Sequence, residues 1–167
     1  MNILRMSNMD KAIVRLCGKN TKERYESYGT SLKKIVVNWL IDNGCEIEDL
    51  KYSLILLNRN GKKYLCSIST CTSDRNNKNF TIGIAVADDY SKDSEYENGW
   101  VALFAVIDEE NIKSLKVINK DKVKEITKEY PRSSGVGTYY ACSFNDVSAN
   151  SSDFEEWLKQ LDEEGES

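Results

Sequence analysis

The dipeptide Asn60-Gly61, set between two apolar runs, constrains the fold of this chain more than any other feature. Asn-Gly is the strongest short signal for a two-residue β-hairpin turn, because both residues tolerate the positive φ angles that such a turn requires. The run Tyr52–Leu57 before it is rich in leucine and isoleucine, and Lys63–Thr70 after it alternates with the period of two of a strand. We therefore predict a β-hairpin at this place.

Apolar residues at helical spacing precede the hairpin and predict a helix with one buried face that ends at Asn43-Gly44; they are Leu32, Ile35, Val36, Trp39 and Leu40. Further strands are predicted over Phe80–Ala87, Trp100–Ile107, Asn111–Ile118 and Tyr139–Phe144. Further helices are predicted over residues 9–18, 120–128 and 153–161, and an acidic loop over residues 88–99. Interleaved strands and helices predict an α/β fold, a central mixed β-sheet flanked by helices, with extra N-terminal and C-terminal helices.

The length fits one domain of 167 residues. We divide it into an N-terminal helical extension over residues 1–28, a core over 29–128, a C-terminal strand and helix over 129–161, and a solvated acidic tail over 162–167. No apolar run approaches the length of a membrane span and no signal-peptide core begins the chain, so we expect an intracellular, cytoplasmic protein without membrane contact.

Histidine is absent, which removes Ser–His–Asp and Cys–His catalysis and every histidine-based metal site. The five cysteines include no CxxC pair, so we expect reduced, mostly apolar thiols rather than a zinc site. Any catalysis would use carboxylates, lysine, tyrosine or serine, and any metal would be a hard cation held by oxygens.

Charge is distributed unevenly along the chain. Residues 1–40 carry eight Lys/Arg against three Asp/Glu, residues 151–167 carry seven acids against Lys159, and the middle is about −3. This excludes a uniformly basic nucleic-acid binder but leaves a basic N-terminal face, which is otherwise a solvated helix surface. The candidate nucleic-acid contacts are Lys11, Arg15, Lys19, Lys22, Arg24, Lys33 and Lys34.

Three segments in order, WLIDNG, YSLILLNRNGKKYLCSISTCT and GWVALFAVIDEENIKSLKVI, resemble the PD-(D/E)xK nuclease superfamily. The resemblance implies a restriction-endonuclease-like fold. In that family an Asp on the first hairpin strand and a Glu on the second hold Mg²⁺, and a Lys two residues further on lies on the same face. Carried over residue by residue, these positions are Ser53, Ser67 and Ser69, and no acid lies near residues 31–33.

Serine hydroxyls carry no charge and are poor Mg²⁺ ligands compared with carboxylates. The resemblance therefore implies a catalytically inert domain without a metal cofactor. Such a domain would bind nucleic acid weakly or bind a protein partner, as in DNA restriction, defence or counter-defence, and a homodimer also stays open.

Two alternatives remain. An active Mg²⁺-dependent nuclease could instead use acids at other positions, with Lys62 or Lys63 as the cation. The first candidates for the metal ligands are Asp49, Asp74 and Asp88, and the further ones are Glu46, Glu48 and Asp89. Alternatively the fold is different, the two serines of Lys63–Thr70 lie on the solvated polar face of an antiparallel strand, and the protein is structural or regulatory with no nucleic-acid role.

Overall fold

The structure is a computed structural model that describes residues 26, 32–51, 53–59, 61–73, 79–92 and 100–165. The predicted helix over 9–18 therefore lies outside the described residues. The larger sheet has six strands in the spatial order β1-β2-β3-β5-β6-β9. Their bounds are β1 Glu46–Lys51, β2 Leu54–Arg59, β3 Lys62–Thr72, β5 Trp100–Asp108, β6 Asn111–Asn119 and β9 Ser152–Asp153.

The hairpin predicted from Asn-Gly is formed by β2 and β3. Arg59 pairs with Lys62 across the turn, Gly61 has a φ of 83°, and its N–H donates to the Asn58 side chain. Strand β3 pairs with β2 in antiparallel fashion on one side and with β5 in parallel fashion on the other, so the sheet is mixed. The predicted α/β fold with a central mixed sheet is confirmed.

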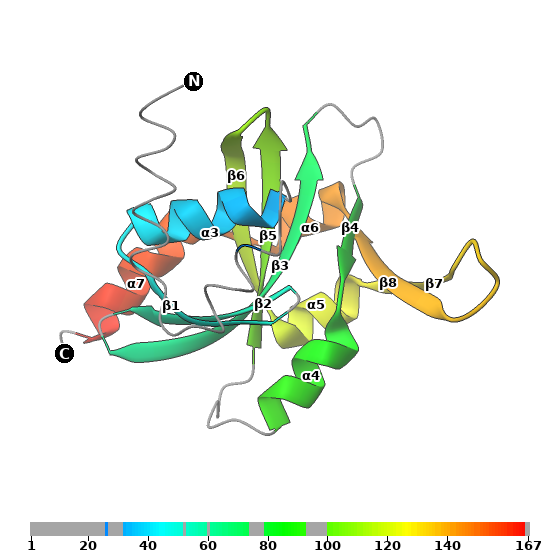
Figure 1. Ribbon diagram of the computed structural model, residues 1–167, viewed down its shortest axis with the longest axis horizontal. Coiled ribbons are helices and arrows are strands. Elements are labelled where there is room, and N and C mark those ends of the chain that lie inside the picture. The colour runs from blue at the N-terminus through cyan, green and yellow to red at the C-terminus, as the bar shows by residue number, and fades with distance from the viewer. Residues whose placement is uncertain are drawn as a thin grey trace.

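A smaller sheet follows the order β4-β8-β7. Its strands are β4 Asn79–Ile82, β7 Lys128–Pro131 and β8 Thr138–Ser143. Strands β7 and β8 form a hairpin that projects away from the larger sheet, at the right of Figure 1. The helices are α3 Leu32–Asp42, α4 Ile84–Lys92, α5 Lys120–Ile126, α6 Phe144–Asn150 and α7 Phe154–Gly165.

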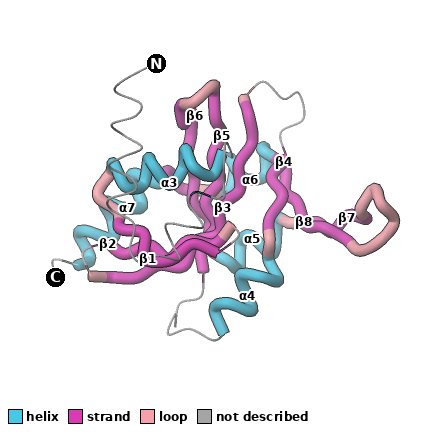
Figure 2. The backbone as a smooth tube through the Cα atoms, in the orientation of Figure 1, coloured by secondary structure: helices cyan, strands magenta, loops and turns pink. Residues whose placement is uncertain are grey.

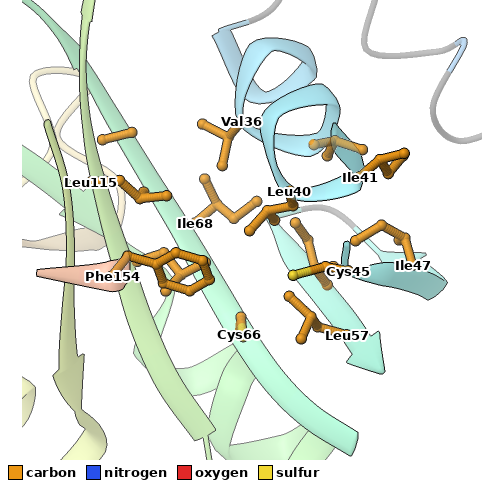
Figure 3. Close-up of a cluster of buried hydrophobic side chains, with 14 of the residues drawn as sticks. Val36, Leu40, Ile41, Cys45, Ile47, Leu57, Cys66, Ile68, Leu115 and Phe154 are labelled. Carbon is orange, nitrogen blue, oxygen red and sulfur yellow. The ribbon is translucent and has the colours of Figure 1, made fainter. Parts of the chain in front are cut away.

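Helices α3 and α7 cover one face of the larger sheet. Their buried side chains meet those of the central strands, as the positions of Val36, Leu40, Ile68 and Phe154 in Figure 3 show. Helix α3 ends as predicted, because Gly44 adopts a φ of 86° and its N–H donates to the Ile41 carbonyl. The opposite face is covered by β4, β8 and helices α4 to α6, around Trp100, Phe80 and Phe104.

One predicted strand is half wrong. Phe80–Ala87 was expected to be extended, but β4 ends at Ile82 and α4 begins at Ile84, so that part of the predicted acidic loop over 88–99 is also helical. Gly83 separates the two elements, and Ala87 is the buried residue of α4. The short apolar run was interpreted as a strand, although its second half begins a helix. Short apolar runs are compatible with both elements, so the local pattern does not distinguish them.

Other elements were missed or misjudged at their ends. Strands β1, β7 and β9 and helix α6 were not predicted, and α7 extends to Gly165, beyond its predicted end at residue 161. The acids of β1 had been placed in a segment before the first strand. No helix in the described part of the chain is long and apolar enough to cross a membrane.

Candidate functional site

The two serines of β3 lie in the centre of the larger sheet. Ser67 is 0% exposed and Ser69 is 3% exposed, and their neighbours on β5 are Ala102 and Phe104. They share one face, because residues two apart on a strand point the same way. The alternative that places both on a solvated polar face is therefore wrong, since β3 is buried by layers on both faces of the sheet.

Ser53 lies in the turn that precedes β2. Its carbonyl accepts the Ile68 N–H at 2.8 Å, which extends the pairing of β2 and β3 by one residue. Its hydroxyl oxygen lies 3.9 Å from the point where a Cβ on Gly83 would be. Gly83 links β4 to α4, so Ser53 lies beside the segment that covers the face of Ser67 and Ser69, although its cross-strand neighbour Ile68 packs on the opposite face.

The hydroxyls of the two buried serines have different environments. Ser69 Oγ donates to the Thr81 carbonyl of β4 at 2.9 Å. Ser67 Oγ has no hydrogen-bond partner among the described residues. Among the described residues, the three serine positions supply neutral hydroxyl groups beside a packed apolar cluster, and these groups are neither charged metal ligands nor cations for a phosphate.

The relocated-acid alternative depends on residues that the structure describes unevenly. Asp49 lies on β1 opposite Leu56, and its side chain is outside the described part, as is all of Asp74. Within the described ranges no group of three Cys, Asp or Glu side chains is placed to hold a metal ion.

The carboxylate of Asp88 already has a hydrogen-bond donor and a cation as partners. Its carboxylate accepts the Trp100 indole N–H at 2.9 Å and forms an ion pair with Lys124 at 2.9 Å. Partial burial alone would raise the pKa of this carboxyl group, but the hydrogen bonds from Trp100 and Lys124 and the charges of Lys124 and Lys120 hold the pKa below its usual range. Asp88 therefore ties α4, β5 and α5 together.

Glu48 is similarly engaged on the edge strand β1. It accepts the Asn58 side-chain N–H at 2.7 Å and pairs with Lys63 at 3.1 Å. The Asn58 hydrogen bond, followed by the contacts of Lys63, holds the pKa of this carboxyl below its usual range despite partial desolvation. Lys63, which was considered as a catalytic cation, thus forms an ion pair with Glu48. The contacts of Glu48 connect β1 to β2 through Asn58 and to β3 through Lys63.

Of the seven predicted basic contacts, the structure describes two. Lys33 and Lys34 lie in the first turn of α3 and are partly buried, and burial lowers the pKa of the Lys33 amine. The remaining five, Lys11, Arg15, Lys19, Lys22 and Arg24, are outside the described residues.

A second basic stretch was missed because charge was summed over the whole middle of the chain. Residues 113–132 carry seven Lys/Arg against three Asp/Glu, a balance of +4. They run through β6, α5 and β7 to the tip of the projecting hairpin. A charge count over a window of about one hairpin, rather than over about two thirds of the chain, would have found it.

The cysteines contribute no reactive site in the described part. Cys45, Cys66, Cys71 and Cys142 are buried and unpaired with one another. Burial raises the pKa of the Cys66 thiol and raises that of Cys142 to about 11, so both are protonated at neutral pH.

No protein-family model fits the sequence, and no curated protein matches it significantly. The candidate site therefore rests on its geometry alone.

Proposed function

We propose that this chain is a catalytically inert, restriction-endonuclease-like domain that acts as a nucleic-acid-binding module. The observation that carries the proposal is the placement of the serines. Ser67 and Ser69 share the buried face of β3 that β4 covers, Ser53 lies beside Gly83 at the junction of β4 and α4, and the three occupy the positions where the resemblance expects two metal-binding acids and a lysine.

The spatial arrangement of the resembling segments supports this proposal. The helix ending at Gly44 covers β1 and β3, the hairpin follows it, and the third segment supplies β5, which pairs with β3, and β6, which pairs with β5. Segments that are separate in sequence thus form one continuous part of the fold. The full burial of Ser67 among apolar neighbours also favours a position without metal, because a bound Mg²⁺ would need several oxygen ligands around it.

Charge supports the binding half of the proposal. The first forty residues carry a balance of +5 and residues 113–132 one of +4, while the chain as a whole is −4. Phosphate attraction depends on local clusters of cations, so two basic stretches on an acidic protein favour weak, salt-sensitive contact with nucleic acid.

A cleavage assay tests the proposed absence of catalytic activity. The purified chain is incubated with supercoiled DNA, single-stranded DNA and RNA in the presence of Mg²⁺ or Mn²⁺. We expect no divalent-metal-dependent cleavage, because the serine positions supply no charged ligand.

Three variants purified in the same way serve as controls: Asp49→Ala, Asp74→Ala and Asp88→Asn. Cleavage by the wild-type chain that any one of them abolishes would overturn the proposal in favour of relocated ligands. Cleavage that persists equally in all three would instead be traced to a contaminating nuclease, by testing whether it separates from the protein on a further column.

A further inference from the structure

The hairpin of β7 and β8 projects beyond the sheet to which it belongs. Strand β4 pairs with β8 only from Tyr140 to Ser143, so residues 130–139 extend past the edge of the smaller sheet. In Figures 1 and 2 this end of the hairpin points away from the rest of the molecule. Val136 at its tip is 78% exposed, although an apolar side chain gains nothing from contact with water.

The projecting part is held in shape by its own contacts. Tyr130 and Tyr139 stack across the hairpin with ring centroids 5.6 Å apart. At the tip, the Arg132 N–H donates to the Gly137 carbonyl and the Gly135 N–H donates to the Arg132 carbonyl. Such a preformed element loses little conformational entropy when it binds a partner, which is the condition for useful affinity from a small contact.

Charge indicates which class of partner fits. The projecting residues 130–139 contain Arg132 and no acid, and they end the basic stretch 113–132. The other described residues carry eight Lys/Arg against seventeen Asp/Glu, a balance of −9. A polyanion is therefore repelled by most of the described chain and attracted to this hairpin and to α5 beside it.

Shape narrows the choice to DNA. A two-stranded β-ribbon fits the major groove of B-form DNA, whereas the major groove of an RNA duplex is too narrow and deep for it. The small side chains of Ser133, Ser134, Gly135 and Gly137 keep the tip slender. The Arg132 side chain lies against Gly137, with its Nε 3.8 Å from the point where a Cβ would be, so the guanidinium stays at the tip.

We propose that the tip of the β7–β8 hairpin enters the major groove of duplex DNA. Arg132 would contact a phosphate or a guanine edge, and Val136 would contact thymine methyl groups. This inference rests on the proposed nucleic-acid-binding function and adds to it a contact far in sequence from the first forty residues.

The test measures binding of a fluorescent DNA duplex two helical turns long, by anisotropy, at several salt concentrations. Arg132→Glu is compared with Lys159→Glu, a matched charge reversal at an exposed site on α7. We expect Arg132→Glu to weaken binding about tenfold and to lower the salt slope by about 0.9 for a lost phosphate contact, and Lys159→Glu to change affinity by less than about twofold.

A second variant and a second probe keep the inference falsifiable. Val136→Ser should weaken DNA binding without changing the salt slope, and an RNA duplex of the same sequence should bind less tightly than DNA. Equal effects of Arg132→Glu and Lys159→Glu, or RNA binding as tight as DNA binding, would overturn the inference and leave the proposed function standing. A wild-type chain that binds no duplex at low salt would overturn both, and the tyrosine-bearing hairpin would then be a contact for a protein.

Discussion

Ser67 and Ser69 differ by one hydrogen bond. Both are buried on the same face of β3, yet Ser69 donates to the Thr81 carbonyl of β4, while Ser67 has no partner among the described residues. A buried hydroxyl without a partner has lost its hydration, whereas a bonded one connects the larger sheet to the smaller. The two serines therefore have different structural roles, although they lie on the same face of the same strand.

Replacing Ser69 by alanine should destabilise the protein by about 1 kcal/mol, because its partly buried hydrogen bond to the Thr81 carbonyl would be lost. Ser67→Ala is the matched control, since it removes a hydroxyl of the same size from the same face and strand. Its effect should lie near zero or be stabilising, because no hydrogen bond is broken. Urea denaturation of the two variants measures both free energies of unfolding, and an equal cost for both would contradict the assignment.

Helix α7 shows how an element depends on contacts distant in sequence. Its acidic end was expected to be a solvated tail, yet Asp162 forms two hydrogen bonds with the Arg59 guanidinium, at 3.1 Å and 2.8 Å. The same guanidinium donates to the Asn43 carbonyl at the end of α3. One arginine on β2 therefore holds the ends of both helices that cover this face of the sheet.

Asp162→Ala should lower the free energy of unfolding by about 1–2 kcal/mol, more than an ordinary surface ion pair, because the contact is bidentate and the Arg59 side chain is only 19% exposed. Glu163→Ala, the neighbouring exposed acid of the same helix, should change stability by less than about 0.5 kcal/mol. Chemical denaturation compares the two variants. The assignment fails if they are equally stable, or if high salt leaves their difference unchanged.

Positive and negative charges are concentrated in different parts of the molecule. Residues 111–145 carry a balance of +4, and residues 146–165, which include most of α6 and all of α7, carry seven acids against Lys159. Net charge alone would exclude a nucleic-acid partner, but phosphates respond to the local field within a Debye length of about 10 Å. Binding of nucleic acid should therefore be weak and should depend on which part of the protein surface faces the phosphates.

The affinity of the wild-type chain for a DNA duplex should fall steeply between low and physiological salt, to a dissociation constant on the order of 10⁻⁵ M or poorer. Replacing Lys33 and Lys34 together by glutamate should weaken binding further and lower the salt slope. A titration of labelled duplex at several salt concentrations measures both. Affinity that does not depend on salt, or that survives the double substitution unchanged, would remove the first forty residues from the contact.

Local chemistry was sufficient to predict some elements of this fold. Asn60-Gly61 determines the β2–β3 hairpin because few other dipeptides make so tight a turn, and the apolar spacing from Leu32 to Leu40 determines α3 and its end at Gly44. Trp100–Ile107 and Asn111–Ile118 were likewise predicted as the strands that became β5 and β6. In each case the signal lies within a few residues of the element that it specifies.

The tertiary structure decided what those signals leave open. Ile84–Lys92 is a helix because its single buried face packs beside Trp100, and the two-residue strand β9 exists only because β6 offers it an edge. The burial of Ser67 and Ser69 depends in the same way on β4 and α4 covering β3. The sequence by itself specified turns and periodicities. The burial of the candidate site comes from contacts between segments that are far apart in the chain. A local sequence pattern does not contain the energies of those contacts.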